Sequence, residues 1–136
     1  MPTPHHLLVI DDEPFIGRIV RLEFERGPYH VSVAHDGEAG LFFLREHPEV
    51  EVVLLDVNLP ARSGLDLLEE ARRDPRLADV AFVVLTAAGQ STTAERARAL
   101  GAAAFVTKPF SPRKLLGQVA ALLGETVDGD PAIEEV

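Results

Sequence analysis

Residues 50–56 read VEVVLLD, an apolar run that ends in Asp56, and this run is the strongest indication of the fold class. Its apolar residues fall on both faces of an extended chain, which is typical of a central strand in a parallel sheet. The strands of such a sheet all point the same way, so their carboxyl ends meet at one edge, where α/β folds bind ligands. Asp56 is therefore expected at a ligand-binding edge.

Three further apolar runs end in polar or charged residues. Residues 7–10 are followed by Asp11 and Asp12, residues 80–85 by Thr86, and residues 102–106 by Thr107, Lys108 and Pro109. If these runs are strands of the same sheet, three carboxylates, one hydroxyl and one ammonium group converge in a single crevice. Oxygen ligands together with an ammonium group suit a divalent cation and a phosphoryl group.

Segments with a helical spacing of apolar residues lie between the strand-like runs. The expected strands are residues 6–10, 29–34, 50–55, 80–85 and 102–106, and the expected helices are residues 14–26, 36–46, 65–73, 94–100 and 111–123. Asp36 and Ser111 are the expected N-caps, and Pro14 and Pro112 suit a first helical turn. This strict alternation predicts an α/β fold with a doubly wound, five-stranded parallel sheet.

The length and the charge distribution predict the domain organisation. The chain has 136 residues and a formal net charge of -9. We expect one domain over residues 1–123. Residues 124–136 are poor in apolar side chains and are expected to form an acidic disordered tail or a linker. Five acidic residues lie in this last segment: Glu125, Asp128, Asp130, Glu134 and Glu135.

The composition also disfavours several classes of protein. The chain has no cysteine, which excludes disulfides, thiolate catalysis and cysteine-bound zinc. Because there is no basic stripe, direct contact with nucleic acid is not expected. There is no signal-peptide pattern, and no apolar run approaches the roughly 20 residues of a membrane helix, so a cytoplasmic protein without membrane contact is expected. The five histidines show no metal-ligand spacing and are expected at the surface.

Four stretches of the sequence carry a family resemblance. They are VIDDEP at residues 9–14, LLDVNLP at residues 54–60 with Gly64 after it, LTA at residues 85–87 and TKPF at residues 107–110. In order and spacing, all four resemble the CheY-like receiver domain of response regulators in two-component signalling, over residues 6 to 123. The resemblance implies the flavodoxin-like (βα)5 topology with strand order 2-1-3-4-5.

The resemblance implies a phosphorylation site at Asp56. A carboxylate can attack a phosphoryl group and hold it as an acylphosphate. The expected ligands of a Mg²⁺ cofactor are the carboxylates of Asp11, Asp12 and Asp56 and the backbone carbonyl of Asn58. Taken alone, Asp56 is also consistent with a cap for the loop after its strand, and Asp12 with the preference of a helix N-terminus for negative charge.

Further residues are expected to bind the phosphoryl group and to respond to it. The expected donors to its oxygens are the Thr86 hydroxyl, the Ala87 backbone N–H and the Lys108 ammonium. A lysine that ends a buried strand also needs a partner of opposite charge. Thr86 and Phe105 are the expected switch residues, although Phe105 is equally consistent with plain core packing. The resemblance also implies a cis peptide bond before Pro109.

The function implied by these residues is that of a regulatory phosphoacceptor rather than an enzyme. A histidine kinase or a phosphotransfer protein would donate a phosphoryl group to Asp56, and the domain would promote this transfer and its own slow dephosphorylation. The new charge would alter the surface formed by the fourth helix, the fifth strand and the fifth helix. This surface includes Arg96, Arg98 and Lys114 and would bind a downstream protein effector.

Two other functions would use a similar set of residues. A small Mg²⁺-dependent phosphatase with an aspartate nucleophile usually needs a second acid two residues after the nucleophile, where this chain has Asn58. An interaction module that is never phosphorylated would be expected to have a degraded acidic site. Ala103 and Ala104 also stand where many DNA-binding members carry an acidic pair that holds receiver dimers together, so this mode of dimerisation is not expected.

Overall fold

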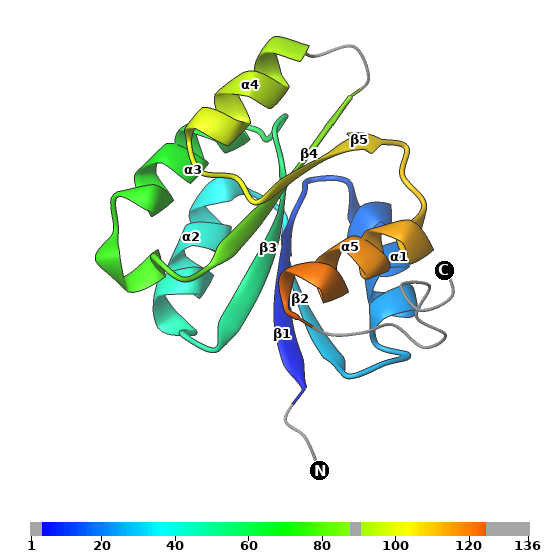
Figure 1. Ribbon diagram of the computed structural model, residues 1–136. Coiled ribbons are helices and arrows are strands. Elements are labelled where there is room, and N and C mark those ends of the chain that lie inside the picture. Colours follow the sequence, from blue (N-terminus) through cyan, green and yellow to red (C-terminus); the bar gives the residue numbers. More distant parts are fainter. Residues whose placement is uncertain (1–3, 88–90, 125–136) are drawn as a thin grey trace.

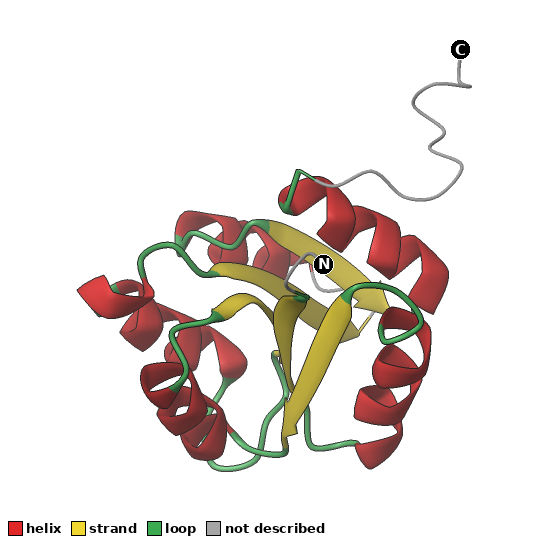
Figure 2. Ribbon diagram, turned by 90° about the horizontal axis from the view of Figure 1, so that it is seen from below, coloured by secondary structure: helices red, strands yellow, loops and turns green. Residues whose placement is uncertain are grey.

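The computed structural model describes residues 4–87 and 91–124. These residues form one five-stranded parallel sheet with the strand order β2-β1-β3-β4-β5. Figures 1 and 2 show helices on both sides of this sheet. The fold class and the strand order expected from the sequence are therefore confirmed. The expected tail lies outside the described residues, apart from Gly124.

Strands and helices alternate along the chain. The strands are β1 (His5–Ile10), β2 (Tyr29–Ala34), β3 (Val50–Asp56), β4 (Ala81–Ala87) and β5 (Ala104–Lys108). The helices are α1 (Pro14–Phe24), α2 (Gly37–Glu46), α3 (Gly64–Arg72), α4 (Ser91–Ala99) and α5 (Pro112–Leu122), with a short 3₁₀ helix, η1 (Pro75–Leu77), before β4. Among the described residues, no helix combines the length and the apolar character that crossing a membrane requires.

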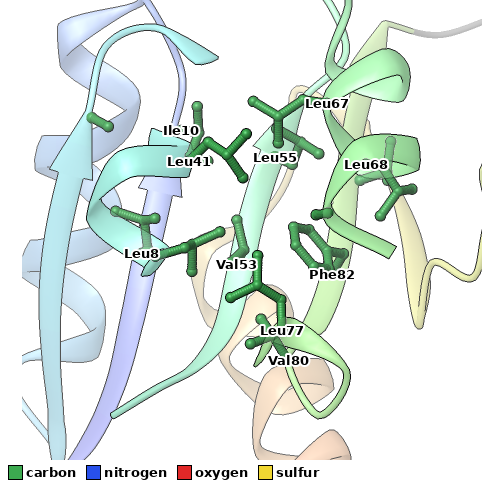
Figure 3. Close-up of a cluster of buried hydrophobic side chains, with 14 of the residues drawn as sticks. Leu8, Ile10, Leu41, Val53, Leu55, Leu67, Leu68, Leu77, Val80 and Phe82 are labelled. Carbon is green, nitrogen blue, oxygen red and sulfur yellow. The ribbon is translucent and has the colours of Figure 1, made fainter. Parts of the chain in front are cut away.

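The core has two layers, one on each side of the sheet. α1 and α5 cover one face, and α2, α3 and α4 cover the other (Figure 1). Under the second group of helices, Leu8, Val53 and Phe82 have no exposed surface (Figure 3). Under α1 and α5, β3 contributes the equally buried Val52 and Leu54. Alternate residues of β3 thus enter both layers, as its apolar composition predicts.

Local capping signals determine where several helices begin. The Asp36 carboxylate accepts a hydrogen bond from the Ala39 N–H at 2.8 Å, and the Ser111 hydroxyl accepts one from the Lys114 N–H at 3.2 Å. These bonds satisfy N–H groups that the first turn of a helix leaves unpaired. Pro14 occupies the first turn of α1, where its missing N–H has no cost. These helix starts are confirmed.

β4 and β5 extend further towards the carboxyl edge than the sequence predicts. The last two pairs of their ladder join Thr86 with Thr107 and Ala87 with Lys108. These four residues were expected just beyond the strands, but they lie within them. The prediction of the strand ends was wrong because a polar side chain at the edge of a sheet can still take part in backbone pairing. The sheet, rather than a loop, therefore fixes these four backbone positions.

The beginnings of α4 and β5 also differ from the expected ones. β5 begins at residue 104, because residues 102 and 103 form the turn after α4. In this turn Gly101 has a φ of 92°, and the Ala102 N–H donates to the Ala97 carbonyl oxygen at 2.9 Å. α4 begins at Ser91 rather than at residue 94. The threonines in its first turn are weak helix formers, so their presence does not predict a helix.

α3 begins very close to the end of β3. The Gly64 N–H donates to the Val57 carbonyl oxygen at 2.8 Å. A Cβ atom at Gly64 would collide with the backbone oxygen of Asp56, so only glycine allows this approach. The contact holds the loop after Asp56 near the carboxyl edge of the sheet.

Candidate functional site

Three carboxylates meet at the carboxyl edge of the sheet. Asp11 and Asp12 follow β1, and Asp56 is the last residue of β3. Each offers one oxygen, and these three oxygens lie within 4.8 Å of one another. Asp11 and Asp56 are 0% and 3% exposed, whereas Asp12 is exposed. The carboxylates that the sequence predicts at one edge therefore do converge.

Backbone amides orient the two buried carboxylates. Oδ1 of Asp11 accepts a hydrogen bond from the Glu13 N–H at 2.9 Å, and Oδ1 of Asp56 accepts one from the Asn58 N–H at 3.1 Å. Both are local turns in which an aspartate binds the backbone two residues further on. Because Oδ1 is held in this way, Oδ2 of each carboxylate is directed towards Lys108.

The Lys108 ammonium is surrounded by carboxylates. Its Nζ lies 2.9 Å from Asp11 Oδ2, 3.4 Å from Asp56 Oδ2 and 3.0 Å from Glu13 Oε1. The side chain is 18% exposed. Lys108 ends β5, and β3 and β4 lie between that strand and β1. The lysine therefore reaches across the edge of the sheet, and its charge is shared by three acids.

The charges in this cluster shift the pKa values of its members. Burial, followed by the negative charge of Asp11, raises the pKa of Asp56 to about 6, against the opposing effects of the Asn58 N–H and Lys108. Burial alone would lower the pKa of Lys108, but its close contacts with the carboxylates of Asp11 and Glu13 and the charge of Asp56 raise this pKa above its ordinary value. The carboxylates outnumber the ammonium, so a cation would relieve their repulsion.

One buried oxygen of the cluster has no well-aligned hydrogen bond. Oδ2 of Asp11 lies at an ion-pair distance from Lys108, yet no donor among the described residues reaches it with hydrogen-bond geometry. A buried carboxylate oxygen in this state favours a second cation. Asp11, Asp12 and Asp56 together offer an all-oxygen donor set, which fits a hard divalent cation.

Thr86 and Ala87 lie beside this cluster on the neighbouring strand. Asp56 pairs with Leu85 of β4, so Thr86 and Ala87 are the next two residues towards the carboxyl edge. Thr86 is 0% exposed, and Ala87 is exposed. Thr86 and Ala87, two of the three residues expected to bind a phosphoryl group, are therefore at the same edge as the carboxylates.

Phe105 lies on the face of the sheet that α4 covers. It pairs with Val84, and Thr86 is two residues further along β4, so Phe105 and Thr86 share one face. Phe105 is partly buried and packs against the core layer that contains Ala97 of α4. The peptide bond between Lys108 and Pro109 is cis.

Two residues of the site were not assigned a role from the sequence. Glu13 binds Lys108, and His35 lies with its Nδ1 3.3 Å from the Asp11 carbonyl oxygen. Glu13 directly follows the two aspartates, but in the sequence it reads only as a favourable charge at the start of a helix. The strand order has to be known before Glu13 can be paired with a lysine 95 residues away.

A family model described as the response regulator receiver domain matches residues 7–120. The chain belongs to this family. The match covers every described strand except the first residues of β1 and includes the whole carboxylate cluster. The expectation of a CheY-like receiver domain is therefore confirmed.

Relatives of the receiver domain include longer regulatory proteins. The DNA-binding dual master transcriptional regulator RpaA of Synechocystis is 36% identical over 120 residues, which are 88% of this chain and 49% of RpaA. The response regulator SaeR of Staphylococcus aureus is 35% identical over 118 residues, 87% of this chain and 50% of SaeR. The chain thus spans about half the length of these relatives.

A solved structure agrees with the fold of the receiver domain. The chemotaxis response regulator CheY4 of Vibrio cholerae superposes with a TM-score of 0.82 at 25% identity, over 88% of this chain and 99% of that one. The flavodoxin-like topology is therefore shared along almost the whole of CheY4.

Proposed function

We propose that this receiver domain is a phosphorylation switch in which Asp56 accepts a phosphoryl group from a phosphohistidine. The donor is a histidine kinase or a phosphotransfer protein. The observation that best supports this is the position of Asp56, which is buried beside Asp11 with its Oδ2 3.4 Å from the Lys108 ammonium. Phosphoryl transfer depends mainly on such positioning and on stabilisation of charge.

The proposed transfer uses Asp56 as the nucleophile. With a pKa of about 6, its carboxylate is mostly ionised at neutral pH. One carboxylate oxygen forms a bond to phosphorus while the bond between phosphorus and the imidazole nitrogen of the donor breaks, and the electron pair leaves with the imidazole. The Asn58 N–H keeps the carboxylate oriented, and Lys108 balances the negative charge of the acylphosphate.

We further propose that the cation bound by the carboxylate cluster is Mg²⁺. Its ligands would be Asp11, Asp12, Asp56 and the backbone carbonyl of Asn58. When bound, it would neutralise negative charge on the transferring group. The exposure of Asp12 supports this assignment, because an ion from solvent can reach its carboxylate before it reaches the buried Asp11 and Asp56.

The switch is proposed to start at Thr86. Phosphorylation adds about 1.5–2 negative charges beside Lys108, and the extra oxygens need donors. The Thr86 hydroxyl and the Ala87 N–H are the proposed donors. A movement of Thr86 towards the phosphoryl group would alter the packing of Phe105, which shares its face of the sheet, and of α4, which covers that face.

The proposed output surface is formed by α4, β5 and α5, and its partner is a downstream protein effector. Arg96, Arg98 and Lys114 give it positive charge, which suits an acidic partner. Arg96 is tied to Asp66 of α3 by an exposed ion pair of 3.4 Å. Exposed pairs of this kind contribute little to stability, so a partner can replace this one easily.

The proposed role of the domain is regulatory, and it does not include the hydrolysis of a separate substrate. A phosphatase with the same nucleophile would need an acid two residues after Asp56, and the amide of Asn58 cannot donate a proton to a leaving group. The slow loss of the phosphoryl group is instead assigned to attack by water on the acylphosphate, promoted by the same site.

We propose that the domain comprises residues 1–123, that residues 124–136 form an acidic tail or linker, and that the domain acts in the cytoplasm through protein contacts. The net charge of the whole chain is -9, and an acidic chain disfavours direct contact with nucleic acid. The DNA binding named for RpaA belongs to that protein, of which this chain covers 49%.

The phosphoacceptor is tested with acetyl phosphate and MgCl₂, followed by intact-mass measurement. The wild type should gain one phosphoryl group, and Asp56→Asn should gain none. Asp74→Asn is the matched control, because Asp74 is also buried but lies outside the carboxylate cluster. It should be labelled like the wild type. Labelling of Asp56→Asn, or labelling that does not depend on Mg²⁺, would contradict the proposal.

The switch is tested by amide NMR shifts with beryllofluoride, a mimic of the phosphoryl group. In the wild type the shifts should extend from the site to α4 and β5, and in Thr86→Ala they should stay near Asp56. Thr107→Ala is the control, because Thr107 is the exposed residue paired with Thr86. A full response in Thr86→Ala would exclude the proposed coupling.

A further inference from the structure

Two histidines lie side by side at the amino edge of the sheet, opposite to the carboxylate cluster. β1 and β2 are neighbouring strands (Figure 1), and their register places His6 directly across from His30. Their ring centroids are 5.2 Å apart, and the ring planes are inclined by 58°. Within residues 4–87 and 91–124, neither ring makes a hydrogen bond or an ion pair. Both rings therefore keep a nitrogen that can act as a ligand.

The spacing of the two rings matches that of two imidazoles bound to one metal ion. With Zn–N bonds of about 2.0–2.1 Å and a tetrahedral angle of about 109°, the two ring centroids lie about 5 Å apart. The strands already supply this separation. The torsion that turns an imidazole ring is broad, so either nitrogen can be presented without moving the backbone.

The surroundings of the pair favour a cation. Glu49 lies at the same edge, one residue before Val50, which is the partner of His6 in β3. The pKa of Glu49 is lowered by its own backbone N–H and by a hydrogen bond to His47, and also by attraction to His6. α2 ends here as well, with His47 as its C-cap, and the C-terminus of a helix attracts positive charge.

We propose that His6 and His30 form a two-imidazole chelate for a divalent transition-metal ion such as Zn²⁺. Imidazole suits zinc, copper and nickel, whereas the carboxylate cluster suits hard ions, so the two edges of the sheet select different metals. Two residues supply the protein ligands, and water completes the coordination. Among the described residues, the carboxylate cluster alone brings three ligand residues this close, so modest affinity is expected at the histidine site.

The test is a calorimetric titration of tag-free protein with ZnCl₂ in excess MgCl₂, which occupies the carboxylate cluster. The wild type should bind one Zn²⁺, and His6→Asn and His30→Asn should each weaken this binding at least about tenfold. His5→Asn is the matched control. It neighbours His6 but lies on the other face of β1, beside Tyr29 and Glu51, and should bind Zn²⁺ like the wild type.

The carboxyl edge provides the second control, because His35 and Asp12 could bind zinc there. His35→Asn and Asp12→Asn should leave the affinity unchanged. NMR spectra of the imidazole nitrogens should show Zn²⁺-dependent shifts at His6 and His30 and none at His35. Wild-type affinity in both His6→Asn and His30→Asn, or loss of binding in Asp12→Asn, would overturn the proposal.

Discussion

Asp56 and Asp74 are both buried, yet their electrostatic surroundings are opposite. Asp56 is 3% exposed, and burial beside Asp11 raises its pKa to about 6. Asp74 is 8% exposed, and hydrogen bonds from Arg76 and then Arg45 hold its pKa well below the usual range. Burial alone therefore does not determine how much an ionised aspartate lowers the stability of the fold. The charges of the neighbouring side chains determine whether this effect is unfavourable or favourable.

Both carboxylate oxygens of Asp74 accept hydrogen bonds from neighbouring residues. Its Oδ2 lies 2.9 Å from Arg76 Nη2 and 3.0 Å from Arg45 Nε, and its Oδ1 caps η1 through the Arg76 N–H. These bonds tie α2 to the segment after α3. At Asp56, by contrast, a second carboxylate stands close by, and one lysine is shared among three acids. Such an arrangement costs stability and is typical of a functional site.

The largest effect is expected from removal of Lys108. In Lys108→Met, the buried carboxylates of Asp11 and Asp56 lose their shared counter-charge, so the free energy of unfolding should fall by roughly 2–4 kcal/mol. Urea denaturation at pH 7 measures this change. The double variant Lys108→Met/Asp56→Asn should recover much of the loss, because one of the two uncompensated charges is gone. Wild-type stability in Lys108→Met would mean that the lysine does not hold the cluster together.

Asp56→Asn should have the next largest effect, with the opposite sign. The folded-state pKa lies above the ordinary value of 3.8, so the ionised form is disfavoured in the folded protein. The wild type should therefore lose stability as the pH rises from about 4 to about 6. Without this loss, the variant should be about 1–3 kcal/mol more stable at pH 7.

Denaturation at a series of pH values checks this prediction. The two proteins should have similar stabilities below about pH 3, where the Asp56 carboxyl is protonated in both the folded and the unfolded chain. A variant that is less stable than the wild type at pH 7 would show that the Asp56 carboxylate is stabilised by its surroundings.

Asp74→Asn should lower stability, and by less than Lys108→Met, because an amide oxygen can still accept hydrogen bonds from Arg76 and Arg45. A carboxylate with a lowered pKa stabilises the fold above its unfolded pKa and loses this effect as the pH falls through its folded pKa. Thermal unfolding should therefore show a difference from the wild type at pH 7 that shrinks in strong acid. Glu69→Gln, in an exposed pair with Arg73, is the control and should unfold like the wild type at both pH values.

The smallest effect is expected from Arg96→Gln. The pair of Arg96 with Asp66 is about half exposed on both sides, so its loss should change stability by less than about 0.5 kcal/mol. Labelling by acetyl phosphate should also be unchanged, because Arg96 is not part of the cluster around Asp56. A loss of stability comparable to that of Lys108→Met would contradict the distinction between exposed and buried charges.

Features that depend on neighbouring residues could be predicted from the sequence. The apolar run before Asp56 predicts a strand buried on both faces, and Asp36 and Ser111 predict helix starts. Each of these depends on burial or capping within a few residues along the chain, and all are present. The convergence of Asp11, Asp12 and Asp56 could also be expected, because parallel strands bring their carboxyl ends to one edge.

The pairing of distant charged groups could not be predicted from the sequence, because it depends on the folded arrangement of the chain. Glu13 binds Lys108 across 95 residues, and Arg45 binds Asp74 across 29. The register of β1 against β2 sets His6 beside His30, although their spacing in the sequence suggests no site. The spacing of apolar residues along the chain predicts whether a residue is buried. Strand order and register determine which residues it faces. Contacts between distant charges depend on this order and register, so no local pattern in the chain contains them.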